Sequence, residues 1–165
     1  MAAGRVSLSW WKTSVSDKVL RLPERPAGPA GVRRILIADD CGPFRGLLAW
    51  FLSSVPGIEI VAEASDGVEA VETARACRPE LVLMDVHMPN MDGLEAARRL
   101  RAEGVAGRII LLSVDAGSVT EAVVAAAGAD AIIDKSELGD RLGSLLDLPA
   151  GEAKAAAMAA HSTGD

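Results

Sequence analysis

Residues 81–93 read LVLMDVHMPNMDG and form the most specific segment of the chain. Leu81–Met84 is a short apolar run of the kind that forms a strand covered by helices on both faces. The loop that follows begins at Asp85, is stiffened by Pro89, and ends at Gly93, which allows close backbone approach as the next helix begins. The stretch therefore predicts a buried parallel strand that delivers an acidic residue to the start of a loop.

The same alternation of apolar runs and amphipathic stretches continues on both sides of this segment. The expected strands are 34–38, 58–62, 81–84, 109–112 and 131–133; the expected helices run from 43 to a stop at 55–57, from 66 to 77, from the loop after 85 to about 103, from 118 to 127 and from about 137 to 146. Pro43 suits a first helical turn, Gly128 a helix C-terminus and Ser136 an N-cap, and Val68 is expected on the inner side of its helix. Five βα units predict a three-layer α/β/α, doubly wound, five-stranded parallel sheet.

Length and composition place this fold in one domain with short extensions. The 165 residues are enough for one core and hardly for two. Residues 21–31 (RLPERPAGPAG) read as a linker, which predicts a flexible basic extension over 1–31, the folded domain over 32–148 and an alanine-rich tail over 149–165. Cys41 and Cys77 have no metal-ligand spacing, and we expect both to be reduced packing residues.

Charge and hydropathy exclude some partners. Residues 1–34 carry a net charge of +5 and the remainder −11, within a total of −6. An acidic main domain is a poor direct binder of nucleic-acid phosphate. No apolar stretch approaches the ~20 residues of a membrane span and no signal peptide is visible, so we expect a cytoplasmic protein without membrane attachment.

Polar residues end four of the five expected strands. In an open parallel sheet, ligands bind at the carboxyl ends of the strands. Asp39 and Asp40 end the first strand, Asp85 the third, Ser113 the fourth and Lys135 the fifth. Each has an ordinary interpretation alone: an acidic pair is often a turn, Ser113 a strand-end hydroxyl and Lys135 a surface charge.

Together these residues predict a phosphoryl-transfer site. Three converging carboxylates repel one another unless a cation compensates, and Mg²⁺ is the divalent ion that suits oxygen ligands with retained waters. An ammonium and a hydroxyl would neutralise and hydrogen-bond an added phosphoryl group. The combination describes phosphoryl transfer to Asp85, where positioning and charge neutralisation supply most of the catalysis.

From about Val32 to Leu148 the chain resembles the receiver domain of two-component response regulators. The match lies in order and spacing: Asp39-Asp40, then Asp85 followed by VHMPNMDG, then Ser113 after IILL, then Lys135 after GADAIID. The resemblance implies a flavodoxin-like strand order 2-1-3-4-5 and makes Asp85 the phosphoacceptor. It also implies that Asp40, Asp85 and the backbone carbonyl of His87 bind Mg²⁺, that Asp39 acts through water, and that Ser113 and Lys135 hold the phosphoryl oxygens.

Two positions depart from the usual pattern of that family. Ile132 stands three residues before the lysine, where members often have an inward-turning Tyr or Phe, so activation is expected to pass through the loop Ser113–Thr120 instead. Ser136 follows Lys135 where Pro is common. The Lys-Ser pair resembles the receiver subgroup usually joined to a LuxR-type helix-turn-helix output.

The resemblance implies phosphorelay signal transduction by a single-domain response regulator. Asp85 would accept a phosphoryl group from a histidine kinase or phosphotransfer protein, and the chain would then bind an unknown protein target, with homodimerisation on phosphorylation a further expectation. It would be no enzyme beyond its own phosphorylation and dephosphorylation. The alternatives are a phosphorylation-independent interaction module, a truncated transcription regulator, and a haloacid-dehalogenase-like phosphatase, which usually has a second aspartate where this chain has His87.

Overall fold

The structure is a computed structural model that describes residues 33–146. Its strands are β1 (Arg33–Ala38), β2 (Ile58–Ala64), β3 (Leu81–Asp85), β4 (Arg108–Ser113) and β5 (Ala131–Asp134). Its helices are α1 (Gly42–Ser53), α2 (Gly67–Cys77), α3 (Gly93–Glu103), α4 (Glu121–Ala126) and α5 (Leu138–Leu145), with short 3₁₀ turns η2 (Ala116–Ser118) and η3 (Lys135–Glu137). The predicted extensions 1–31 and 149–165 lie outside the described residues.

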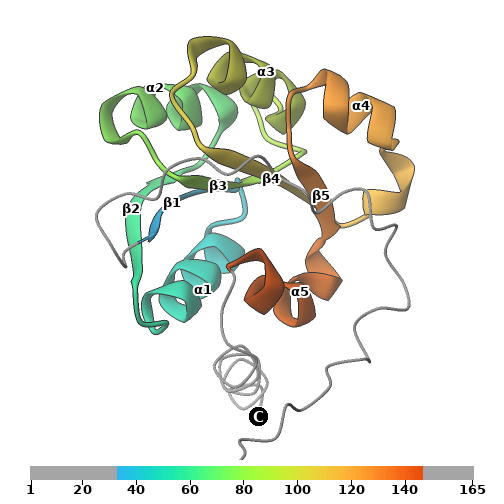
Figure 1. The fold of residues 1–165 in the computed structure, drawn as a ribbon. Coiled ribbons are helices and arrows are strands. Elements are labelled where there is room, and N and C mark those ends of the chain that lie inside the picture. Colours follow the sequence, from blue (N-terminus) through green and yellow to red (C-terminus); the bar gives the residue numbers. More distant parts are fainter. Residues whose placement is uncertain (1–32, 147–165) are drawn as a thin grey trace, which may run out of the picture.

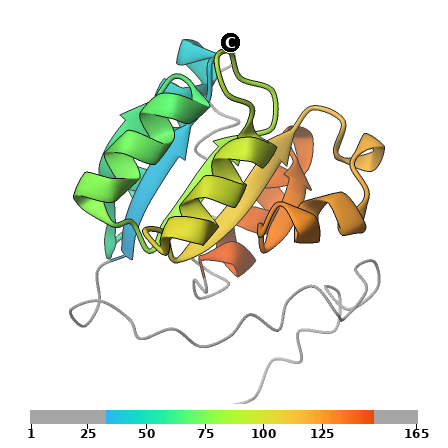
Figure 2. The same cartoon turned by 90° about the horizontal axis from the view of Figure 1, so that it is seen from above.

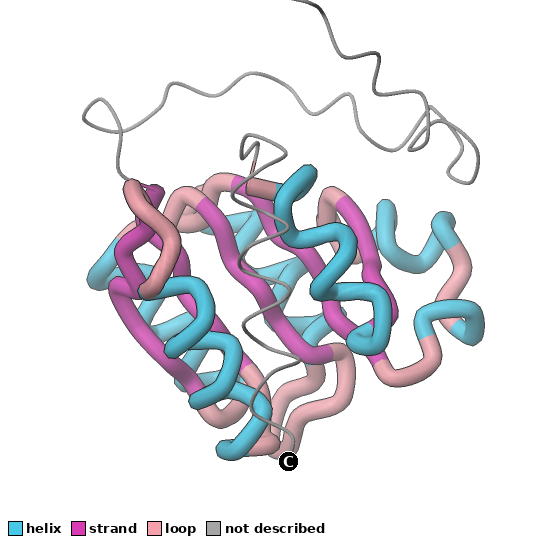
Figure 3. Tube along the Cα trace, turned by 90° about the horizontal axis from the view of Figure 1, so that it is seen from below, coloured by secondary structure: helices cyan, strands magenta, loops and turns pink. Residues whose placement is uncertain are grey.

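The five strands form one parallel sheet in the order β2-β1-β3-β4-β5. Helices α2, α3 and α4 cover one face of the sheet, and α1 and α5 cover the other (Figure 1). Figure 2 shows the first helical layer in front of the strands, and Figure 3 shows the opposite face. The predicted three-layer α/β/α fold and its strand order are confirmed.

The central residues of β1, β3 and β4 are apolar because both faces of the sheet are buried there. In β1, Leu36 and Ala38 belong to the core under α2 and α3, whereas Ile35 and Ile37 belong to the core under α1 and α5. Successive side chains of a strand point to opposite faces, so a strand between two helical layers needs apolar residues at every position. All four of these side chains are completely buried.

Local signals fix where the helices begin and end. Asp66 and Asp92 cap α2 and α3, each accepting a hydrogen bond of 2.8 Å from the backbone N–H three residues on. Pro43 lies in the first turn of α1, as predicted. Gly128 follows α4 with φ +71°, the left-handed conformation that the sequence predicts for it. Within residues 33–146, no helix is long and apolar enough to cross a bilayer.

Four local predictions are wrong. Ser136 is no N-cap: it lies inside η3, and its backbone N–H and its hydroxyl both donate to the carboxylate of Asp134, which caps that turn. Val68 is 38% exposed, because the buried face of α2 consists of Gly67, Ala70, Val71 and Ala74. The expected helix over 118–127 is reduced to the six residues of α4. Cys41 is exposed and so is no packing residue, while Cys77 is half-buried.

Candidate functional site

Strand register brings the predicted site residues to one edge of the sheet. Ala38 pairs with Met84, so Asp39 and Asp85 are neighbours at the ends of β1 and β3. On the next pair of strands Asp85 lies opposite Leu112, which places Ser113 one residue farther along. Ser113 in turn pairs with Asp134, directly before Lys135. Residues separated by almost a hundred positions therefore meet at the carboxyl ends of four strands, the edge where this fold class binds its ligands.

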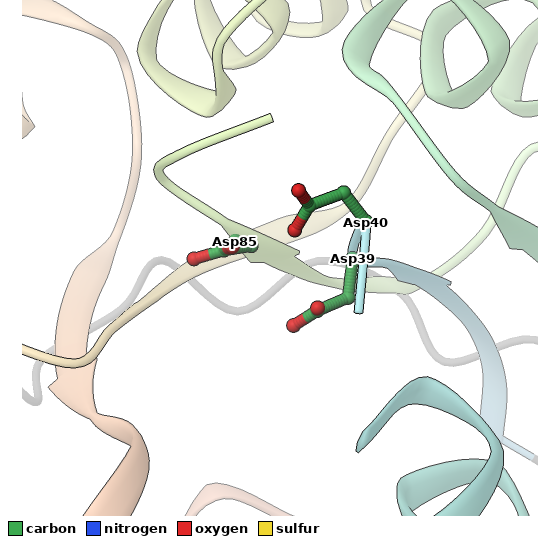
Figure 4. Close-up of side chains that lie close together, drawn as sticks. All are labelled: Asp39, Asp40 and Asp85. Atoms are coloured by element: carbon green, nitrogen blue, oxygen red, sulfur yellow. The ribbon is translucent and has the colours of Figure 1, made fainter. Parts of the chain in front are cut away.

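Three carboxylates converge at this edge. Asp39, Asp40 and Asp85 each place one oxygen within 4.8 Å of the others (Figure 4). Asp39 is fully buried and Asp85 is 6% exposed, whereas Asp40 is exposed. Oxygen Oδ1 of Asp39 accepts a hydrogen bond of 2.9 Å from the backbone N–H of Cys41. Asp40 thus offers its carboxylate to solvent while Asp39 is held by the protein.

Lys135 provides the positive charge of the site. Its ammonium nitrogen lies 2.7 Å from Oδ2 of Asp39 and 3.3 Å from Oδ2 of Asp85. The buried Oδ2 atom of Asp39 accepts no hydrogen bond from the other described residues, so its ion pair with Lys135 is the contact that compensates its charge. The Lys135 side chain is 14% exposed, so the ion pair is shielded from most of the solvent screening that weakens surface pairs.

Burial and neighbouring charges shift the ionisation of both Asp85 and Lys135. Burial raises the pKa of Asp85 above its usual value, and the nearby negative charge of Asp39 raises it further, although Lys135 opposes both. Burial alone would lower the pKa of Lys135, but hydrogen bonds to and the charges of Asp39 and Asp85 outweigh it and raise that pKa. The site therefore holds Lys135 as a cation and disfavours an uncompensated negative charge on Asp85.

The loop after β3 is fixed tightly against Asp85. A Cβ atom added to Gly93 would lie 2.1 Å from the carbonyl oxygen of Asp85, and the Gly93 N–H donates to the Val86 carbonyl at 2.8 Å. Asn90 has φ +62° and donates to the Asp66 carboxylate at 2.8 Å, which ties the loop to the start of α2. The predicted role of Gly93 in close approach is confirmed.

His87 contributes to the site through its backbone. Its side chain is exposed, and its backbone lowers the pKa of Asp85, which partly offsets the raising effect of burial. The family resemblance implies that the backbone carbonyl of His87 binds Mg²⁺, and this role stays a prediction.

Ser113 is buried, and its hydroxyl oxygen accepts a hydrogen bond of 3.1 Å from the backbone N–H of Asp115. The same loop is tied to β5 at its next residue, because the Ala116 N–H lies 3.4 Å from a carboxylate oxygen of Asp134. A serine hydroxyl that accepts here retains its own proton for donation to another group. The loop after β4 is thus connected both to Ser113 and to the residue before Lys135.

Two further residues at this edge were not predicted from the sequence. Arg45 in α1 donates a short hydrogen bond to the backbone carbonyl of Asp39 and pairs with Glu63 at 3.2 Å, tying α1 to the ends of β1 and β2. The ring of Phe44 lies under Lys135, with its centroid 4.6 Å from the ammonium nitrogen. Both contacts join segments distant in sequence, and helical periodicity marks Phe44 only as an apolar position.

Comparison with known proteins agrees with this geometry. The family model of the response regulator receiver domain matches residues 35–147, well over half of the chain. This chain belongs to the response regulator receiver family. The resemblance found in the sequence is confirmed.

Curated relatives carry receivers within longer proteins. The receiver is 44% identical over 104 residues to protein-glutamate methylesterase/protein-glutamine glutaminase 4 of Myxococcus xanthus, covering 62% of this chain and 29% of that protein. It is 36% identical over 119 residues to the nitrate/nitrite response regulator protein NarL of Escherichia coli, covering 72% of this chain and 55% of that protein. The chain therefore spans less than a third of the first relative and about half of the second.

Solved structures show the same fold. The response regulator domain of Thermotoga maritima CheB is 28% identical with a TM-score of 0.63, and the match covers 76% of this chain and 96% of that one. The complex of the P1 domain of CheA3 with CheY6 from R. sphaeroides matches at 30% identity and a TM-score of 0.57, over 70% of this chain and 97% of that one. One similar solved structure is therefore a complex of two proteins, the P1 domain of CheA3 and CheY6.

Receivers generally bind Mg²⁺, and the residues of this one fit the ion. Its donor set consists of hard carboxylate oxygens, one exposed and two buried, which is the chemistry Mg²⁺ prefers. The raised pKa of Asp85 shows that the protein alone leaves the negative charge incompletely compensated. A divalent cation beside Asp40 and Asp85 would remove that imbalance.

Proposed function

We propose that this chain is a phosphorylation switch in a phosphorelay, in which Asp85 accepts a phosphoryl group and the modified protein changes its affinity for a protein target. One observation carries the proposal: Asp39, Asp40, Asp85, Ser113 and Lys135 share one edge of the sheet, with the lysine ammonium between two of the carboxylates. Family membership supports the same chemistry.

In the proposed step, a carboxylate oxygen of Asp85 attacks the phosphorus of a phosphohistidine on a histidine kinase or phosphotransfer protein. A P–O bond forms, the P–N bond breaks, and the histidine leaves. The backbone of His87 lowers the pKa of Asp85 and so favours the charged form of the attacking carboxylate. Lys135 lies 3.3 Å from that carboxylate, close enough to pair with the oxygens of the incoming phosphoryl group, and the Ser113 hydroxyl donates to them.

Mg²⁺ is the proposed cofactor, held directly by Asp40, Asp85 and the His87 carbonyl and through water by Asp39. When bound, the ion would neutralise charge on the transferred group. The burial of Asp39 and its engagement by Lys135 and Cys41 N–H support an indirect role for it, while the exposure of Asp40 supports a direct one.

The proposed output passes from the loop after β4 to the surface formed by α4, β5 and α5. Ile132 has no aromatic ring to turn inward, so the signal would travel through the loop after β4, whose residues Asp115 and Ala116 donate to Ser113 and Asp134. A phosphoryl group adds about −2 charge next to Ser113 and Lys135, and switches of this kind typically redistribute ~1–3 kcal/mol between two states. We propose that the chain works as a switch and not as an enzyme that turns over a substrate.

The test is intact-protein mass spectrometry after incubation with Mg²⁺ and acetyl phosphate, with Asp85→Asn as the matched variant. We expect an adduct of about +80 Da, stable in acid and labile in base as an aspartyl phosphate is, that is absent from Asp85→Asn. Absence of the adduct in the unmodified sequence, with Mg²⁺ binding shown separately, would contradict the proposal and favour a phosphorylation-independent interaction module.

A further inference from the structure

Lys135 has a third neighbour besides the two carboxylates. Its ammonium nitrogen lies 2.7 Å from Asp39, 3.3 Å from Asp85 and 4.6 Å from the centroid of the Phe44 ring. An ammonium within about 6 Å of a ring centroid, over its face, is attracted by the negative charge of the π-system. With only 14% of the Lys135 side chain exposed, water competes weakly for this contact.

The fold keeps the Phe44 ring in place independently of Lys135. Phe44 lies in the first turn of α1, which begins three residues after Asp39, so one short segment delivers both a carboxylate and the ring to the site. The ring is half-buried and packs against the core cluster under α1 and α5. Because apolar packing fixes the ring, the flexible lysine side chain has a rigid aromatic surface to contact.

The ring differs from the carboxylates in what happens to it during phosphorylation. One carboxylate oxygen of Asp85 forms a bond to phosphorus, and a divalent cation at the site would repel the ammonium. Asp85 is therefore a weaker partner for Lys135 when the phosphoryl group arrives. A neutral ring is not consumed by either event and attracts the ammonium throughout.

We propose that Phe44 is a positioning residue that holds the Lys135 ammonium at the phosphoryl site through a cation–π contact. The proposal rests on the function proposed above and adds to it a residue that holds the lysine independently of its carboxylate partners. Its chemistry requires an aromatic face, so tyrosine should replace Phe44 and leucine should not, although leucine also fills apolar space.

Phe51 offers the matched control. It is the only other phenylalanine of the chain, lies on the same helix, and is a core residue with 8% exposure. Phe51→Leu removes a ring from α1 at a position that belongs to the core cluster, and so reports the cost of lost packing alone. A purely structural role for Phe44 predicts that Phe44→Leu and Phe51→Leu behave alike.

The first readout is the proton chemical shift of the Lys135 ε-methylene group, which can be measured without phosphorylation. The chain has four lysines, so Lys135→Arg identifies the relevant signal in a lysine-labelled full-length sample. We expect the Lys135 ε-methylene protons to be shifted upfield by the Phe44 ring, with and without Mg²⁺. The shift should persist in Phe44→Tyr and Phe51→Leu and vanish in Phe44→Leu. An unshifted signal, or one indifferent to Phe44→Leu, would overturn the proposal.

The second readout is the rate of Asp85 phosphorylation by acetyl phosphate, with each variant first shown to be folded. Phe44→Leu should slow the reaction about three- to thirtyfold, the range expected for one partly desolvated cation–π contact, and Phe44→Tyr should recover most of the rate. A Phe44→Leu rate equal to that of Phe51→Leu would overturn the positioning role and leave the proposed function intact. An unmodified sequence that accepts no phosphoryl group would instead overturn the proposed function, and this role with it.

Discussion

Gly93→Ala is a sharp test of how the β3–α3 loop positions Asp85. An added Cβ would lie 2.1 Å from the Asp85 carbonyl oxygen and 3.0 Å from the Asp85 carbonyl carbon and the Val86 Cα. All three atoms belong to the backbone of a buried segment, so no flexible side chain can move aside. The separation from the oxygen must grow by roughly 1 Å before the contact becomes tolerable.

The expected cost follows from that displacement. Overpacking a tight site typically destabilises a protein by about 1–3 kcal/mol, and a rigid backbone neighbour points to the upper part of that range. An alanine in a helix otherwise gains up to ~1 kcal/mol over glycine. We therefore expect Gly93→Ala to lower the free energy of unfolding by about 1–2 kcal/mol.

Gly46→Ala is the matched control for this substitution. Gly46 lies inside α1, is exposed, and has no atom within 4 Å of an added Cβ. The same chemical change should there stabilise the protein by ~0.5–1 kcal/mol, because only the conformational freedom of the unfolded chain is reduced. The two variants are thus expected to shift stability in opposite directions.

Urea denaturation followed by circular dichroism measures both variants. The phosphorylation rate of Gly93→Ala at full folding should also fall, since a displacement of about 1 Å at a reacting group can cost a hundredfold. A Gly93→Ala protein as stable as the unmodified sequence, with an unchanged phosphorylation rate, would refute the argument that the loop fixes Asp85 through this contact.

Three further predictions concern the charges of the protein. Mg²⁺ at ten times its dissociation constant should raise the free energy of unfolding by about 1.4 kcal/mol, and Asp40→Asn should abolish most of this gain in a thermal-shift titration. Burial, aided by Asp39, raises the pKa of Asp85, so the folded state holds this proton more tightly than the unfolded chain does. The stability that this proton contributes is lost as the pH rises through the raised pKa. Without metal, Asp85→Asn should therefore be more stable than the unmodified sequence at neutral pH, and a pH series of urea melts should give it a flatter stability profile. Arg101→Met should lower the free energy of unfolding in urea melts by about 2–4 kcal/mol, because Arg101 donates to two backbone carbonyls and a half-buried carboxylate. Arg99→Met removes only a surface ion pair and should change the free energy of unfolding by less than ~0.5 kcal/mol.

The fold could be predicted because its determinants are local in sequence. Continuous apolar strands such as Leu81–Met84 occur where both faces of a sheet are covered, and the alternation with amphipathic stretches leaves few other architectures. The convergence of Asp39, Asp85 and Lys135 also followed, because parallel strands deliver their carboxyl ends to one edge. The order and spacing of apolar and polar residues were enough to predict the layered fold and the convergence of these side chains.

The remaining features depend on contacts that local patterns do not encode. Helical periodicity gave Phe44 a core position and could not reveal that its ring meets Lys135, which lies beyond the fourth following strand. Ser136 has N-cap chemistry, but Asp134 two residues earlier is the better acceptor and starts the turn first. Cys41 appeared apolar by type, yet it caps α1 at an edge open to solvent.

The central claim is that Asp85 itself receives the phosphoryl group. The most direct measurement is to phosphorylate the protein with acetyl phosphate and Mg²⁺, reduce it with borohydride, which converts an aspartyl phosphate to homoserine, and sequence the peptides by tandem mass spectrometry. Our account predicts homoserine at position 85 and unmodified aspartate at positions 39 and 40. Homoserine at position 39 or 40 with intact Asp85, or no conversion at any aspartate, would contradict it.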